Sequence, residues 1–446
     1  MRNVMKIRIT IATLLLAVSS ISHGQAVPTA TTSMVPSNSG LSFSPLDGVF
    51  HYALTASEIA QRGYYGPSQW TSSTALSGNA SYAAKSTVHP FNMIFAGGVS
   101  LPNQSAQSTT SFWNISASQG YVTRKWIFNV SDSFSFLPQS PTTGLSGISG
   151  VGDLGAIPVQ GPGGGPAGGV LSNVGNRIAN TLSGSLERQL DHATSISGNG
   201  AWSVLNFVNA SPTSGAINDE QISGTVALNR RLDARSSVSL DAVYSTFTYS
   251  GAGSVLIAPD IETRGLNLAY QRLLSRSLSV SVSAGPQWVS SSNSALVPSN
   301  LNVAATAAVE YSRGNTNGSI SYSRGVNSGS GVLPGALADT VGGSLAHSYG
   351  RNWVASINAA YTHTAGLTQL IVGSPIAPVN SVYETVFGGA QVTRRISTHL
   401  SGYLSYTAQN QSSNFSVPGQ NSLNGTSHTF GIGITFSPRS TRLGQF

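Results

Sequence analysis

The sequence predicts an all-β protein, a transmembrane antiparallel up-and-down β-barrel of about 18 strands with short periplasmic turns and long extracellular loops. Its composition is the first observation behind this prediction. Only 8% of the 446 residues are charged, whereas soluble domains carry about 25%. Yet no apolar stretch after residue 24 approaches the roughly twenty residues of a spanning helix. A barrel with lipid outside and water inside fits both facts.

Alternation of apolar and polar side chains is the second observation. It is clearest over residues 278–288 and returns over 301–311, 353–361 and 429–436. In a strand, successive side chains point to opposite faces, so one face can contact lipid and the other water. Each run is about ten residues long, the length that a tilted transmembrane strand requires.

A repeated hairpin is the third observation. Arginines end successive alternating runs, at intervals of about 41 residues, and lie in tight connections: Arg188, Arg231, Arg272, Arg313, Arg351 and Arg395. The connections between these units are long and nearly uncharged, as at 248–260, 289–300, 364–381 and 409–425. Each unit therefore predicts a strand, a short turn, a strand and a long loop. Counting the runs gives about 18 strands and places both ends of the barrel in the periplasm.

The first 24 residues have the pattern of a secretory signal peptide. Arg2, Lys6 and Arg8 precede a short apolar run that is followed by small residues. We therefore expect export to the bacterial outer membrane. The predicted organisation is a signal peptide at 1–24, a flexible mature N-terminus at 25–48, the barrel at 49–436 and a C-terminal tail at 437–446. The chain has no cysteine, so disulfides play no part in its stability.

The 138–176 segment departs from the repeat. It is rich in Gly and Pro, has Asp153 as its one charge, and includes Gly161-Pro162-Gly163-Gly164-Gly165-Pro166, which cannot form a strand. By the up-and-down count it lies on the long-loop side. Two arrangements stay open. It is either a surface loop or a loop folded into the lumen, where Asp153 would be a constriction residue.

The last alternating strand carries Phe430, Ile432, Ile434 and Phe436 between glycines and threonines. It resembles the terminal strand by which outer-membrane barrels are recognised for assembly. That resemblance implies the assembly machinery and outer-membrane lipid as partners. A tail ending in Phe446 follows, which leaves open whether Phe436 or Phe446 ends the assembly signal.

A wider resemblance covers most of the mature chain. The hairpin repeat, together with Leu137-Pro138-Gln139-Ser140-Pro141-Thr142-Thr143-Gly144-Leu145-Ser146-Gly147 and Gly152-Asp153-Leu154-Gly155, resembles uncharacterised porin-like outer-membrane proteins of acidobacteria. The resemblance implies the location and the fold. It supplies neither a substrate nor a functional site.

Five polar residues have the parity of the lumen side and are predicted to line a pore: Asp241, Asn267, Ser281, Asn302 and Glu310. Acidic side chains there can bias ion passage, or can be solvated wall residues without a selective effect. Asp132 has the opposite parity, and a carboxylate that faces lipid near mid-membrane is unfavourable. We therefore predict a β-bulge near Ser131 that turns Asp132 inward.

The sequence contains no motif that indicates catalysis or cofactor binding. Its histidines lack the spacing of a metal site, and no nucleophile elbow or phosphate-binding loop has its structural context. The formal charge of +7 comes from basic residues that lie singly or in pairs rather than in a patch, which argues against nucleic acid. We expect no enzymatic activity, no cofactor, no metal and no nucleic-acid partner.

The predicted barrel width favours transport. About eighteen strands enclose a space that wall side chains alone cannot fill. The sequence therefore predicts a porin-like channel for passive diffusion of small hydrophilic solutes. Two alternatives remain, namely a structural or adhesive barrel occluded by the 138–176 segment, and an exported β-solenoid passenger. The oligomeric state stays open.

Overall fold

The computed structural model describes ten stretches of the chain: residues 48–63, 70–103, 109–137, 176–208, 217–251, 259–329, 333–368, 381–414, 425–438 and 441–443. The predicted signal peptide, the segment 25–47 and the segment 138–175 with Asp153 lie outside the described residues. Within the described stretches, no helix has the length and apolar character needed to cross a membrane.

A single 19-stranded sheet makes up the fold. Its strands are β1 (Gly48–Arg62), β2 (Thr71–Ala84), β3 (Phe91–Pro102), β4 (Thr110–Val122), β5 (Trp126–Leu137), β6 (Asn176–Gln189), β7 (Thr194–Val208), β8 (Ile217–Arg231), β9 (Ser236–Gly251), β10 (Ile261–Ser275), β11 (Leu278–Ser291), β12 (Asn300–Arg313), β13 (Thr316–Asn327), β14 (Ala336–Tyr349), β15 (Trp353–Gly366), β16 (Val382–Arg395), β17 (Leu400–Ser413), β18 (Gly425–Phe436) and β19 (Thr441–Leu443).

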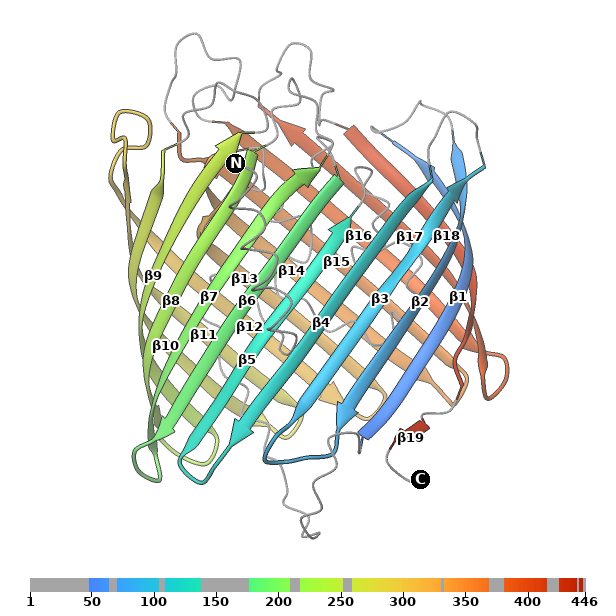
Figure 1. The fold of residues 1–446 in the computed structure, drawn as a ribbon, viewed down its shortest axis with the longest axis horizontal. Coiled ribbons are helices and arrows are strands. Elements are labelled where there is room, and N and C mark those ends of the chain that lie inside the picture. The colour runs from blue at the N-terminus through green and yellow to red at the C-terminus, as the bar shows by residue number, and fades with distance from the viewer. Residues whose placement is uncertain are drawn as a thin grey trace, which may run out of the picture.

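The sheet closes into a barrel because β1 pairs with both β2 and β18. Each of the strands β2–β17 pairs with the strands before and after it in the chain, and the long strands cross the wall at a common tilt (Figure 1). The closing seam places Leu54 opposite Phe436, and the hydroxyl oxygens of Thr55 and Thr435 lie 2.9 Å apart across it. The predicted fold class and the predicted count of 18 barrel strands are confirmed.

Strand β18 shows how the two faces of the wall differ. Phe430, Ile432, Ile434 and Phe436 are between 44% and 60% exposed, whereas Thr435 is 4% exposed. The inner face of a barrel is concave and crowds its side chains, so the buried set faces the lumen. The exposed apolar set faces lipid. The alternation read from the sequence therefore places its apolar residues on the outside, as predicted.

A glycine in β18 makes room for an aromatic ring at the closing seam. A Cβ atom on Gly433 would lie 2.6 Å from the ring of Tyr403 and 2.8 Å from the Cβ of Ser57. Tyr403 of β17 therefore covers the bare backbone of β18 on the lumen side, next to β1. Rings that cover strand glycines in this way help to hold neighbouring strands in register.

The strands are longer than the ten or so residues expected. β1–β18 contain from 12 to 16 residues each. At their long-loop ends they carry carboxylates with outward parity: Glu58, Glu220, Glu262, Asp339 and Glu384. Charged groups on the lipid side cost least near the interfaces. The long-loop ends of the strands therefore extend beyond the hydrocarbon layer.

Short turns join the strands at the other end, and aspartates hold two of them. In the β6–β7 turn, Asp191 Oδ1 accepts hydrogen bonds from the amides of Ala193 and Thr194, both at 2.7 Å. Asp233 Oδ1 accepts the equivalent two bonds in the β8–β9 turn, at 2.6 and 2.8 Å. The Ala193 and Thr194 amides lower the pKa of Asp191 from its ordinary value, because they stabilise the charged form.

The β-bulge predicted near Ser131 is wrong. Strand β5 pairs with β4 and β6 in unbroken register through Ser131 and Asp132, so Asp132 lies on the lipid-facing side. Its Oδ1 accepts a hydrogen bond from Asn180 Nδ2 at 2.8 Å. On the lumen side, the hydroxyls of Ser131 and Ser183 are hydrogen-bonded. The Asn180 amide gives the Asp132 carboxylate a hydrogen-bond partner, which lowers the cost of burying this polar group in a regular strand. Parity along β5 alone does not reveal this partner.

Part of the predicted tail forms a strand. β19 pairs with the start of β1, with Leu443 opposite Gly48 and Thr441 opposite Phe50. It lies at the short-turn end, next to the beginning of β1 (Figure 1). β19 thus continues the edge of β1 that β18 leaves unpaired after Phe436. Phe446 lies outside the described residues.

Candidate functional site

The lumen wall is hydrophilic but weakly charged. Its buried polar side chains are mostly hydroxyls and amides, including Thr55, Ser57, Ser245, Thr263, Thr362, Thr385, Gln391, Thr407, Gln409 and Gln411. Among the described residues, Asp219 and Asp241 are the two acids in the buried polar set. Hydroxyls and amides can hydrogen-bond to water and to neutral solutes without imposing a strong field.

Two of the predicted pore-lining residues lie together. Asp241 on β9 is opposite Asn267 on β10, and Asp241 is 4% exposed. Asn267 Oδ1 is buried without a hydrogen-bond partner in the described part of the chain. The β10–β11 pairing is interrupted beside this pair, where Pro286 has no amide hydrogen to donate. The pair therefore lies at a point where the hydrogen-bond ladder of the wall is incomplete.

The other three predicted residues are spread over β11 and β12. Glu310 is exposed, and its Oε2 accepts a hydrogen bond from Ser279 Oγ at 3.3 Å. Asn302 has a buried Nδ2 without a hydrogen-bond partner among the described residues, and Ser281 lies opposite Ala308. All three have the lumen parity. A pore-lining role stays a prediction for all five residues.

An apolar cluster covers the lumen side of the wall near the long-loop end. Its buried members are Ile217, Phe247, Tyr249, Ile261, Val289, Val297 and Val326, with Leu337 and Leu367 packed against them. The rule that polar side chains face the lumen does not predict this cluster. The sequence does contain one sign of the cluster. Phe247 and Tyr249 have the same parity on β9 as Asp241, which predicts that both rings face the lumen.

Two connections on the long-loop side fold onto this cluster. Val297, between β11 and β12, is 1% exposed, and Ser291 donates a hydrogen bond to its carbonyl at 2.8 Å. Leu333, between β13 and β14, is fully buried. The next turn requires glycine, because Gly335 has a φ of 75° and a Cβ there would lie 2.4 Å from Ile261 Cδ1. Both connections therefore lie against the inner wall at the mouth.

A carboxylate lies within this apolar mouth. Asp219 is 7% exposed and lies opposite Tyr249 across the β8–β9 pairing. Asp219 Oδ2 and the Tyr249 hydroxyl have no hydrogen-bond partner in the described stretches. Buried polar atoms without partners are uncommon in purely structural clusters. The mouth, with Asp219 and Tyr249, is therefore the second candidate site beside the lumen wall.

Metal binding finds no support in the described residues, where no group of three or more His, Asp or Glu could hold an ion. His363 Nδ1 lies 3.5 Å from Glu384 Oε1, and the ring of His428 stacks on Tyr406. Both histidines have outward parity near the long-loop end. Polar aromatic residues near strand ends are typical of a membrane interface.

No protein-family model matches the sequence, and no curated protein matches it. Solved structures do match. The outer membrane protein OpdK of Pseudomonas aeruginosa has a TM-score of 0.43 and 8% identity, over 89% of this chain and 99% of that chain. OccK2 (OpdF) of the same organism, in complex with glucuronate, has a TM-score of 0.41 and 9% identity, over 87% and 97% of the two chains. The siderophore receptor PirA of P. aeruginosa has a TM-score of 0.41 and 10% identity, over 89% and 81%. Likenesses this distant carry no function across, so the function is considered from the barrel's own residues.

Proposed function

We propose that this protein is a porin-like channel of the bacterial outer membrane for passive diffusion of small hydrophilic solutes. The observation that carries the proposal is the closed barrel of 18 strands with an apolar outer face and a hydroxyl- and amide-lined inner face. Barrels of about 16–18 strands leave an aqueous space that their wall side chains do not fill. The outer face suits a bilayer, and the inner face suits water.

The inner wall supports weak selectivity among solutes. Asp241 and Glu310 provide negative charge on the lumen side, whereas the surrounding wall is mostly neutral. Asn267 and Asn302 have the same lumen parity, but Asn267 Oδ1 and Asn302 Nδ2 are buried, so these two atoms do not contact a passing solute. Small neutral or weakly cationic solutes are therefore the favoured class.

A second candidate is an occluded barrel that presents surface loops. The apolar cluster and the connections folded onto it favour this candidate, because they cover part of the lumen at its mouth. The 138–176 segment with Asp153 would then complete the closure. In the channel proposal, the same segment narrows the lumen without sealing it.

Conductance separates the two candidates. Full-length protein, checked for folding by its heat-modifiable migration, is added to a planar bilayer. The channel proposal predicts stepwise conductance, and deletion of residues 138–176 should raise each step. A bilayer that stays sealed at high protein loading contradicts the channel. Conductance that begins only in the deletion variant establishes the occluded barrel.

Charge substitutions test the role of the lumen residues within a working channel. Asp241→Asn and Glu310→Gln should each lower the preference for cations, measured as a reversal potential across a salt gradient. Glu220→Gln is the control, because Glu220 has outward parity and its Oε1 accepts a hydrogen bond from Trp202 Nε1 at 2.7 Å. An unchanged preference in both lumen variants would show that these residues are solvated wall residues.

The proposal also includes an assembly signal in the last long strand. Recognition by the assembly machinery would use Phe430, Ile432, Ile434 and Phe436 of β18, the strand that closes the barrel on β1. Kinship with porin-like proteins of acidobacteria also stays a prediction. The proposal assigns the protein no catalytic residue and no cofactor.

A further inference from the structure

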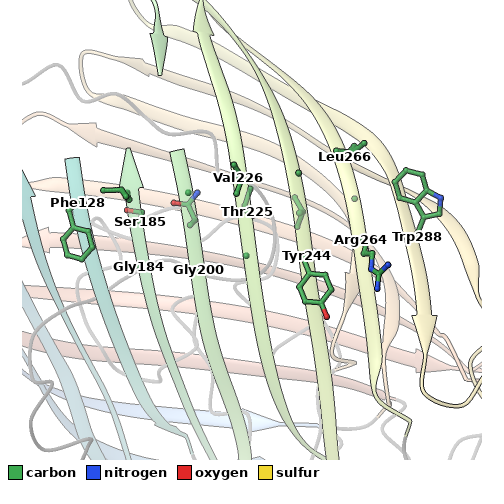
Figure 2. A pocket seen from close by; sticks show the side chains of 17 residues that line it. Phe128, Gly184, Ser185, Gly200, Thr225, Val226, Tyr244, Arg264, Leu266 and Trp288 are labelled. Atoms are coloured by element: carbon green, nitrogen blue, oxygen red, sulfur yellow. The ribbon is translucent and has the colours of Figure 1, made fainter. Parts of the chain in front are cut away.

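An elongated hollow lies in the lipid-facing wall over β5–β11. It has a volume of about 880 Å³ and extends between Phe128 at one side and Trp288 at the other (Figure 2). Its apolar edges include Leu186, Val226 and Leu266, which are between 43% and 57% exposed. A volume of this size lies within the roughly 300–1,000 Å³ typical of sites for small molecules.

Six cross-strand neighbours form one continuous row through the hollow: Gly184, Gly200, Gly224, Tyr244, Arg264 and Trp288. The strands are tilted, so a row perpendicular to them changes depth across the bilayer. Gly184 lies five residues from the short-turn end of β6 (189 minus 184), and Arg264 lies three residues from the long-loop end of β10 (264 minus 261). The hollow therefore rises through the membrane toward the long-loop side.

The glycines of the floor are not required by the fold. A methyl group on Gly184 or Gly198 would meet no atom of the described chain within 4 Å. On Gly200 or Gly224, its nearest neighbour would be a backbone oxygen at 3.9 or 3.8 Å. Glycine weakens a strand, yet larger side chains would fit at all four positions. A glycine within a strand commonly marks a bulge, a tight bend or the close approach of another molecule. The register of β6, β7 and β8 is unbroken at these glycines, which excludes a bulge and favours close approach.

A cationic side chain lies at the end of the hollow that is nearer the long loops. Arg264 is the one charged side chain among the residues that line it. The side chain is 68% exposed, and its Nη2 lies 3.1 Å from Glu262 Oε2. This single contact leaves further guanidinium hydrogens for a second anion. Guanidinium groups bind phosphate through paired hydrogen bonds. Tyr244 and Trp288 flank Arg264, as aromatic residues do at the level of lipid headgroups.

We infer that this hollow is a specific site for lipid A, the phosphorylated glycolipid of the outer leaflet. Arg264 binds a phosphate, and one acyl chain lies over Gly224, Gly200 and Gly184 toward Phe128. A narrow apolar path with one cation at its headgroup end matches an amphiphile more closely than the convex wall of a second barrel. The inference rests on the outer-membrane location proposed above, but not on conduction.

Native mass spectrometry of the full-length protein in detergent tests this site. Hexa-acylated diphosphoryl lipid A should give one retained lipid per barrel. Gly200→Leu combined with Gly224→Leu fills the floor without a clash and should weaken binding at least about tenfold. Arg264→Gln should weaken binding of diphosphoryl lipid A but leave binding of the dephosphorylated lipid unchanged.

Matched controls keep the result interpretable. Gly388→Leu on β16 is the control for added bulk, because it has outward parity outside the hollow and its nearest neighbour would be a backbone oxygen at 3.9 Å. Heat-modifiable migration reports folding, and single-channel conductance of each variant should equal that of the wild type. Wild-type binding in the double leucine variant overturns the site. Equal retention of phosphatidylglycerol and lipid A also overturns it. A wild-type dimer that the leucines abolish assigns the hollow to a second copy instead. If the wild-type protein retains lipid A but does not conduct, the channel proposal fails and the lipid site stands.

Discussion

The two ends of the barrel are stabilised in different ways. At the short-turn end, Arg188 Cζ lies 5.1 Å from the ring centroid of Trp126, and Arg394 Cζ lies 5.1 Å from that of Trp353. The turns there are held by local hydrogen bonds. At the long-loop end, side chains far apart in the sequence pack into one apolar cluster on the lumen side. Contacts within a turn or between two adjacent strands therefore define the short-turn end, and packing across many strands and connections defines the long-loop end.

This difference bears on where function can reside. Turns fixed by contacts between near neighbours hold the hairpins in register whatever the other end does. The long-loop end depends on connections folded onto the wall, which can vary without changing the register of the strands. In the proposed channel, the long-loop end would therefore set the access of solutes to the lumen.

The largest expected effect comes from emptying the cluster at the mouth. Phe247 is 1% exposed, and Phe247→Ala should lower the free energy of unfolding by about 3–5 kcal/mol. Urea unfolding of the barrel in detergent micelles measures this change. Leu240→Ala on the same strand is the control, because Leu240 is 53% exposed toward lipid and its loss leaves no internal cavity. Equal losses in the two variants would contradict the view that the long-loop end is held by interior packing.

Predictability from the sequence follows the same division. The hairpins were predictable because alternation and turn residues are local signals, and the register that they imply agrees with the pairings of β8, β9 and β10. The partner of Asp132 was not, because Asn180 lies on the next strand after a long connection and sequence parity does not show which side chains face each other. The inward packing of Phe247 and Tyr249 depends on connections whose path no local pattern encodes. The hollow was not predictable from the sequence, because the alignment of Gly184, Gly200 and Gly224 depends on the register between strands.

A smaller effect is expected from the turn aspartates, and it should depend on pH. Hydrogen bonds from Ser236 and from the Arg235 amide lower the pKa of Asp233 from its ordinary value of 3.8, as the turn amides do for Asp191. A lowered pKa in the folded state stabilises the fold above pH 3.8, and this stabilisation is lost as the pH falls through the folded-state value.

The double variant Asp191→Asn, Asp233→Asn tests this effect. At pH 7 its urea midpoint should lie below that of the wild type, by less than the shift for Phe247→Ala. The gap should close as the pH falls below about 3.8, because the wild-type carboxyls then lose their charge. A gap that stays constant down to pH 2 would show that these turns do not depend on ionised aspartate.

The smallest effect should come from ion pairs at the outer rim of the long-loop end. Arg324 Nη1 lies 2.6 Å from Asp339 Oδ2, with the two side chains 36% and 26% exposed, and the Tyr322 hydroxyl donates to Asp339 Oδ1 at 2.8 Å. Because part of each side chain is open at the rim, solvent screens the pair in part, and Asp339→Asn should cost about 1 kcal/mol. Raising NaCl from about 0.05 M to about 1 M shortens the screening length at least roughly threefold. The destabilisation caused by Asp339→Asn should therefore be smaller at the higher salt concentration.

The matched variant at the short-turn end is Arg394→Gln, which removes the contact with Trp353 and should also cost about 0.5–1 kcal/mol. If both electrostatic variants are small while Phe247→Ala is large, the two ends differ through interior packing and not through surface charge. A loss for Asp339→Asn that equals the loss for Phe247→Ala would instead make the charged rim the element that holds the long-loop end together.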